Sequence, residues 1–295
     1  MKAARIILLY AVAVVLVSTL LAPWVFRAVQ HGGAYLARQP FHRVYDRILL
    51  IVAAAGLWPL LRALGVRHWK DIGWVCSPRG WPGLARGLGL GAGSLGLVAL
   101  LLLLVGGWHW RGDLSGAALI GGSVKFALSA LAVGLLEETF FRGGIQSALA
   151  RGLDVRWAVP VTSVVYSMVH FLKAPAVEIQ VATVTWASGF VHLARVLGDL
   201  PRIPDVAQGF VTLWLAGMIL GWAFVWTRAL YLSIGIHAGW VFVLKLFSWA
   251  SVAPGPSTAW WIGGSLVGSP VAWPVLLALL AQVWWICRRK TLPLN

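Results

Sequence analysis

Long apolar runs recur along the whole chain, and each is close to the length that a helix needs to cross a bilayer. A transmembrane helix takes about 20 predominantly apolar residues. Eight segments approach this length: 6–26, 47–64, 84–107, 117–137, 156–172, 207–227, 230–250 and 266–287. Because the backbone polar groups of such a segment must be satisfied within lipid, the runs predict helices. The sequence therefore predicts an all-α, polytopic transmembrane helical bundle with about eight spans.

A further stretch, residues 177–194, is only moderately apolar. It contains Glu178, Gln180 and His192, and Arg195 follows it directly. Charged groups are costly in the hydrocarbon core. We therefore expect a re-entrant or interfacial helix near 177–194 rather than another free span.

The composition excludes a water-soluble globular protein. Hydrophobic residues make up 60% of the chain and charged residues only 11%, against about 25% charged residues in soluble domains. Such a chain has too little polar surface to cover itself in water, so the bilayer must be its solvent. The length predicts a single integral membrane domain over residues 1–295, and the sequence does not indicate an oligomeric state.

The net charge of +15 comes from basic residues in short loops between the apolar runs. This pattern indicates contact with anionic lipids and excludes nucleic acid, because no basic stripe is long enough to follow a phosphate backbone. Basic residues near both ends predict that both termini are cytoplasmic, in the cytoplasmic (inner) membrane, with an even number of spans and a retained first helix. Three arginines of the first external loop oppose this orientation: Arg27, Arg38 and Arg43.

Two adjacent glutamates, Glu137 and Glu138, end the fourth apolar run. Ionisable groups in spans cost about a few kcal/mol each and suggest function by default. On a helix, Glu138 and Arg142 share a face and can pair, whereas Glu137 points about 100° away. We expect Arg142 to hold Glu138 ionised and Glu137 to be the freer carboxylate, which makes it the candidate general base.

Two histidines lie in other apolar runs. His170 ends the fifth, one turn after Tyr166, and His237 lies in the middle of the seventh. Two histidines with two carboxylates can supply a base, a proton carrier and a polarising group. The alternative is a purely structural polar network. Glycines at helix-packing spacings also occur in these runs: Gly87-x-Gly89-x-Gly91-x-Gly93, Gly217-xxx-Gly221 and Gly235-xxx-Gly239, the last of which brackets His237.

Three motifs occur in order: Glu-Glu-xxx-Arg, aromatic-xxx-His, and a histidine in a late helix. This set resembles the CPBP family of intramembrane proteases, which includes the type II CAAX prenyl endopeptidases and the bacteriocin-processing or self-immunity (Abi-like) proteins. The resemblance covers residues 117–250, the expected catalytic core. It implies an intramembrane endopeptidase that hydrolyses a peptide bond of a membrane-associated peptide or protein substrate.

The resemblance also implies roles for the residues of the motifs. Glu137 and His170 would activate a water molecule, and His237 would stabilise the oxyanion. Glu138 and Arg142 would order the site. Three aromatic residues would support the site and its substrate pocket: Tyr166, Phe141 and Trp240.

One position departs from the family pattern. The family commonly has an asparagine four residues after the last histidine, as a second oxyanion donor, and this chain has Val241 there. Loss of one such donor costs about 10²–10³ in rate, so we consider Trp240 and Lys245 as replacements. A non-catalytic membrane binding or immunity protein of the same fold, or a proton-coupled carrier, is the alternative.

We expect no cofactor. Zinc or another divalent metal held by the same Glu/His set is the alternative, because histidine and carboxylate are zinc ligands. No His-Glu-x-x-His motif supports it, since none of the seven histidines is followed by glutamate.

Overall fold

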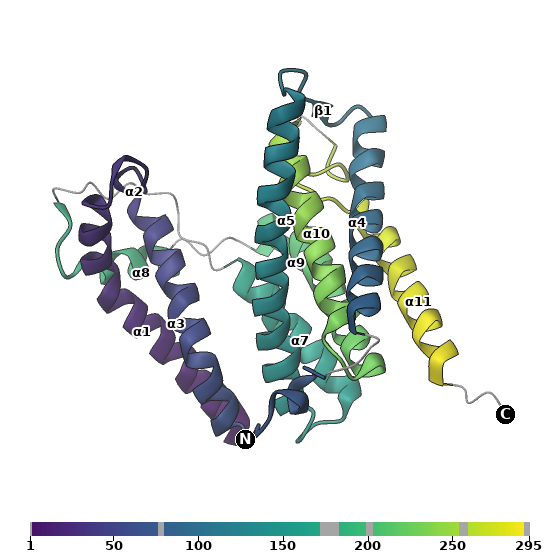
Figure 1. The fold of residues 1–295 in the computed structure, drawn as a ribbon, viewed down its shortest axis with the longest axis horizontal. Coiled ribbons are helices and arrows are strands. Elements are labelled where there is room, and N and C mark those ends of the chain that lie inside the picture. Colours follow the sequence, from purple (N-terminus) through teal and green to yellow (C-terminus); the bar gives the residue numbers. More distant parts are fainter. Residues whose placement is uncertain (1, 76–79, 172–182, 199–202, 254–258, 292–295) are drawn as a thin grey trace. The chain divides into compact units, whose positions relative to one another are not determined.

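The computed structural model describes residues 2–75, 80–171, 183–198, 203–253 and 259–291. Helices form nearly all of the regular structure (Figure 1). Among these residues, six helices are long and apolar enough to cross a bilayer. The predicted all-α polytopic membrane fold is confirmed. Each of the eight apolar runs contains a helix, although residues 266–271 of the last run precede its helix. Helix α7 (Val155–His170) has 16 residues, and the apolar part of α11 (Ala272–Thr291) is also short, so the number of spans stays a prediction.

The chain divides into two compact units, each with its own core. The first comprises Met1–Arg67 and Val169–Arg202, and the second comprises His68–Met168 and Ile203–Asn295. A single integral domain over residues 1–295 stays a prediction.

In its described residues, the first unit has two long helices and two short ones. Its elements are α1 (Lys2–Gln30), α2 (Ala34–Ala37), α3 (Phe41–Ala63) and α8 (Ser188–Gly198). Helix α1 packs on both α3 and α8. The core between α1 and α3 includes Phe26, Phe41 and Tyr45, and the Thr19 and Tyr45 hydroxyls share a hydrogen bond of 2.9 Å.

Of the range 177–194, where a helix was expected, the structure describes residues 183–194. The first part of that range lies outside the described residues, and α8 begins only at Ser188. The Thr185 amide donates to Ser188 Oγ at 2.9 Å. A serine that accepts from a nearby backbone amide favours a local turn over a continuous helix, which explains why residues 184–187 are not helical.

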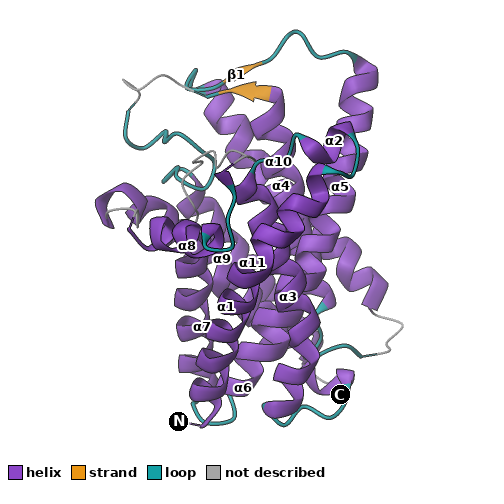
Figure 2. Cartoon of the chain, turned by 90° about the vertical axis from the view of Figure 1, so that its left-hand side faces the viewer, coloured by secondary structure: helices purple, strands orange, loops and turns teal. Residues whose placement is uncertain are grey.

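The second unit contains the remaining elements. They are η1 (Trp69–Ile72), α4 (Gly80–Leu104), β1 (His109–Trp110), α5 (Gly116–Glu138), η2 (Thr139–Gln146), α6 (Ser147–Leu149), α7 (Val155–His170, which runs past the unit boundary), α9 (Ile203–Thr227), α10 (Tyr231–Ala250), β2 (Ser251–Val252) and α11 (Ala272–Thr291). The strands form an antiparallel pair with His109 opposite Val252 (Figure 2). This pair links the end of α10 to the connection between α4 and α5.

Helix α10 lies between α4 and α5 and contacts both (Figure 1). A β-carbon on Gly87 would lie 2.9 Å from the Cα of Gly235, and one on Gly239 would lie 2.6 Å from the Ala92 amide nitrogen. The glycine face of α10 therefore packs directly on the backbone of α4. His237, between Gly235 and Gly239, is on the opposite side of the helix and faces α5.

We expect Gly91→Ala to destabilise the helix pair. A β-carbon there would overlap the Ile236 carbonyl, and such overpacking costs about 1–3 kcal/mol. Gly93→Ala is the matched control, because nothing lies within 4 Å of the position; alanine there should stabilise the helix slightly. Thermal unfolding in detergent measures both, and equal stability of the two variants would contradict this packing.

Candidate active site

The end of α5 changes from an α-helix to a wider helix at the glutamate pair. Thr139–Gln146 (η2) is π-helical, and Ser147 Oγ donates to the Arg142 carbonyl at 3.0 Å. π-Helical turns are rare and frequently occur at functional sites. Gly143 packs against Ile72, where a β-carbon would come within 3.1 Å. The two carboxylates thus lie at the junction between the α-helix α5 and the π-helical segment η2.

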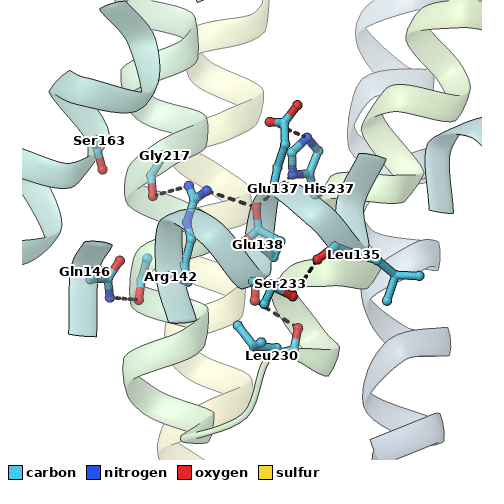
Figure 3. A network of polar contacts seen from close by, with 12 residues as sticks. Leu135, Glu137, Glu138, Arg142, Gln146, Ser163, Gly217, Leu230, Ser233 and His237 are labelled. Atoms are coloured by element: carbon cyan, nitrogen blue, oxygen red, sulfur yellow. Dashed lines mark hydrogen bonds and ion pairs between the residues drawn. The ribbon is translucent and has the colours of Figure 1, made fainter. Parts of the chain in front are cut away.

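The Glu138 side chain is fully buried and contacts the side chains of both Arg142 and His237. Arg142 Nη1 donates to Glu138 Oε1 at 2.9 Å, and His237 Nδ1 lies 2.8 Å from the same oxygen (Figure 3). The predicted pair of Glu138 and Arg142 is confirmed. The structure adds His237 to it, which the sequence analysis had not paired with either glutamate.

Arg142 is also bonded to α9. Its Nη2 donates to the Gly217 carbonyl at 3.2 Å, and Gln146 Nε2 donates to the Gly221 carbonyl at 3.1 Å (Figure 3). A side chain at Gly217 would collide with Ser163 at 2.8 Å. These glycines, interpreted above as plain helix packing, therefore also let η2 reach the α9 backbone. Gln146 was missed, although its i+4 spacing from Arg142 was a usable signal.

Glu137 faces the other side of the imidazole. Its Oε2 lies 3.7 Å from His237 Nε2, and its side chain is 28% exposed, against 4% for His237. This separation is longer than a hydrogen bond. His237 lies near both glutamates. Glu137 is the accessible carboxylate of the pair.

Aromatic rings enclose the buried part of this network. The Tyr166 ring meets the rings of Phe141 and His237 edge to face, with centroids 5.1 and 6.1 Å apart. The Arg142 guanidinium lies over the Tyr166 ring, 4.7 Å from its centroid. Phe141 and Tyr166 are thus placed as the expected aromatic support.

Trp240 has a different environment from the one expected. Its indole N–H donates to Ser94 on α4 at 3.0 Å, and its ring belongs to the core between α4, α9 and α10. The geometry therefore does not support Trp240 as a pocket residue or as an oxyanion donor. The other replacement considered, Lys245, donates to Ser129 on α5. Val241 is half-buried.

His170 is the last residue of α7, one turn beyond Tyr166. It lies past the boundary between the two units, which falls after Met168. Its approach to Glu137 therefore stays a prediction.

The Glu/His set is the site at which the sequence analysis placed a divalent metal ion as the alternative. Over the described part of the chain, no three His, Cys, Asp or Glu side chains are grouped in a way that would hold one. Glu138 Oε1 is already occupied by Arg142 and His237. The expectation that no cofactor is needed stays a prediction.

Residues 120–243 match the family model described as type II CAAX prenyl endopeptidase Rce1-like. The match falls within the predicted core at 117–250 and covers both glutamates, Arg142, His170 and His237. No curated protein and no solved structure matches the chain. The family resemblance derived from the three motifs is confirmed.

Proposed function

We propose that this chain is an intramembrane glutamate-type endopeptidase that hydrolyses a peptide bond of a membrane-associated substrate, because residues 120–243 match the Rce1-like endopeptidase family model. The observation that carries the proposal is the connected series Arg142–Glu138–His237, which ends opposite the accessible Glu137. A base, an oriented imidazole and a fixed counter-charge are the parts that amide hydrolysis needs.

In the proposed mechanism, Glu138 is a positioning residue. Paired with Arg142 and buried, it accepts the Nδ1–H of His237 and thereby fixes which imidazole nitrogen faces the substrate. The hydrogen bond at one ring nitrogen determines the role of the other. With Nδ1–H bonded to Glu138, Nε2 can donate only when the imidazole carries a proton on both nitrogens. The proposed state of His237 is therefore the imidazolium, whose Nε2–H lies on the side of Glu137 and stabilises the oxyanion of the tetrahedral intermediate.

Glu137 is the proposed general base, with His170 as its partner. Its carboxylate takes a proton from the water that attacks the scissile carbonyl, and returns a proton to the leaving amine as the C–N bond breaks. The partial exposure of Glu137 supports this role, because a base must be reached by both water and substrate.

We propose that the protein is in the cytoplasmic membrane with both termini on the cytoplasmic side. The arginine-rich segments at 62–86 and 142–156 support this orientation, since short cytoplasmic loops carry an excess of Lys and Arg. The partners are a membrane-associated peptide or protein and a bilayer containing anionic lipids. No nucleic acid takes part.

A non-catalytic binding or immunity protein of the same fold is the second candidate. Val241 favours it, because a valine cannot supply the second oxyanion donor, and the Trp240 N–H beside it is bonded to Ser94.

One experiment separates the two candidates. The purified full chain in vesicles is given a library of lipid-anchored peptides in water labelled with heavy oxygen. An endopeptidase creates new carboxyl termini that contain the label, which mass spectrometry detects. A binding protein or a carrier leaves every peptide at its original length.

We expect the peptidase activity to survive exhaustive dialysis against a chelator, with a change of less than about twofold, because the residues that the structure describes contain no grouped ligand set for a metal. The rate is measured before and after dialysis and again after zinc is added. Activity that is lost on dialysis and restored by zinc would overturn the metal-free mechanism.

A further inference from the structure

A short segment before α4 contacts both halves of the candidate active site. Residues 72–75, the connecting segment, comprise the end of η1 and the three residues after it, and they lie outside the part of the chain that matches the family model. One side of the segment contacts η2, which begins directly after Glu138, and the other side contacts the start of α10, the helix of His237. The segment can therefore influence how the two halves meet.

Trp74 and Thr139 make the polar contact on the η2 side. Trp74 Nε1 donates to Thr139 Oγ1 at 3.1 Å, and Thr139 Oγ1 donates to the Leu135 carbonyl at 2.6 Å. An indole N–H can only donate, so the hydroxyl must accept from Trp74 and direct its own hydrogen to the carbonyl. Trp74 thus fixes the orientation of the Thr139 hydroxyl.

The Thr139 hydroxyl acts on the helical turn that carries both glutamates. Thr139 is the first residue of η2, and its backbone amide also donates to the Leu135 carbonyl. A threonine that bonds the carbonyl four residues back often bends a helix, and here the α-helix widens into a π-helix at that residue. The direction of Glu137, on the same turn, therefore depends on how Thr139 is held.

The other side of the connecting segment is bonded to the start of α10. The Leu230 amide donates to the Gly73 carbonyl at 3.1 Å, and the Tyr231 hydroxyl donates to the Val75 carbonyl at 3.0 Å. The rings of Trp74 and Tyr231 meet edge to face, with centroids 5.9 Å apart. The indole that bonds to Thr139 is thus also packed on the first residue of α10.

Close backbone packing keeps the connecting segment in place. Gly73 has a φ of +89°, and a β-carbon there would lie 2.5 Å from the Phe224 ring, so glycine is required for both conformation and space. Ile72 is fully buried. From Tyr231, α10 continues for six residues to His237, about 9 Å along the helix axis. The segment therefore holds the beginning of the helix that presents the imidazole.

Building on the proposed peptidase function, we propose that Trp74 is a positioning residue for Glu137. It acts through Thr139, and the connecting segment joins this contact to the helix of His237. The 3.7 Å separation between Glu137 Oε2 and His237 Nε2 then depends on a residue outside the family match. Without the indole N–H, Glu137 is less well directed at the attacking water. Such a loss of orientation lowers the rate of the chemical step rather than substrate affinity.

Substitutions on both sides of the hydrogen bond test this role. Trp74→Phe keeps an aromatic ring and removes the N–H, so kcat should fall about three- to tenfold, the size of one hydrogen bond, with KM nearly unchanged. Thr139→Val keeps the shape without the hydroxyl and should lose at least as much, whereas Thr139→Ser should keep most of the parental rate. The double variant Trp74→Phe, Thr139→Val should fall no further than Thr139→Val alone.

The rates are compared per folded protein, well below the unfolding temperature, so that a loss of stability alone leaves kcat unchanged. Trp69→Phe is the matched control, since it alters a half-exposed indole of η1 and should not change kcat. The imidazole nitrogen NMR signals of His237, assigned with His237→Ala, give a second readout that needs no hydrolysis. Trp74→Phe should shift these signals, because they report the nearby Glu137 carboxylate, and Trp69→Phe should not.

Parental kcat and parental His237 signals in Trp74→Phe would overturn the positioning role. So would losses that simply add in the double variant, because the two side chains would then act separately. A parent chain that hydrolyses no peptide would instead contradict the proposed function. In that case the His237 signals of Trp74→Phe alone decide whether Trp74 positions Glu137.

Discussion

Glutamine in place of Glu137 is expected to lower peptide hydrolysis by about 10²–10⁴-fold, the contribution of a general base. The amide has nearly the shape of the carboxylate but cannot take the proton of the attacking water. Glu137 is the accessible member of the pair, and the Arg142–Glu138–His237 series does not pass through it. The substitution should therefore remove the base and leave that series in place.

The measurement is the rate of appearance of labelled carboxyl termini, with kcat and KM determined separately. The loss should fall mainly on kcat, because a base acts in the transition state. Asp113→Asn is the control, since it also neutralises an acid but in an exposed loop pair with Arg111. A Glu137→Gln variant that keeps more than about a tenth of the parental rate would not be compatible with Glu137 as the base.

Local spacing explains what could be predicted at the site. Glu138 and Arg142 are four residues apart, and this separation brings side chains together on a helix whatever the rest of the fold does. The bond between them forms even though η2 is π-helical rather than α-helical. The apolar runs were predictable for a similar reason, because the bilayer requires a helix from each of them.

Contacts between distant segments could not be predicted in the same way. The distance of 99 residues between Glu138 and His237 contains no periodic signal for their hydrogen bond. The direction of the Trp240 indole depends on Ser94, a residue of another helix. Both depend on how α10 is rotated between its neighbours, which the sequence pattern alone leaves undetermined.

The glycines on α10 account for that rotation. Gly235 and Gly239 can lie against the α4 backbone only because they lack side chains. With that face fixed on α4, His237 must point away from it, toward α5 and the glutamates. The Gly235-xxx-Gly239 motif therefore does not contact the imidazole of His237. It fixes the rotation of α10 from the opposite side of the helix, and this rotation directs the imidazole toward Glu138.

Removal of the Arg142 charge is expected to have the largest effect on stability. Arg142→Leu removes the guanidinium that pairs with the fully buried Glu138. Breaking a buried ion pair on one side costs about 3–5 kcal/mol of unfolding free energy. The variant also loses the bond to the Gly217 carbonyl and the contact with the Tyr166 ring, so η2 should be held less firmly on α9.

Glu138→Gln should restore much of that loss when it is combined with Arg142→Leu, because the double variant buries no unpaired charge. Thermal unfolding in detergent of the parent, both single variants and the double variant gives the coupling between the two side chains. Arg156→Met is the control: its pair with Asp154 is exposed, and such pairs contribute little. If the stability losses of the two single variants simply add in the double variant, Arg142 does not hold Glu138 ionised. That result would contradict the proposal that a fixed Glu138 carboxylate positions His237.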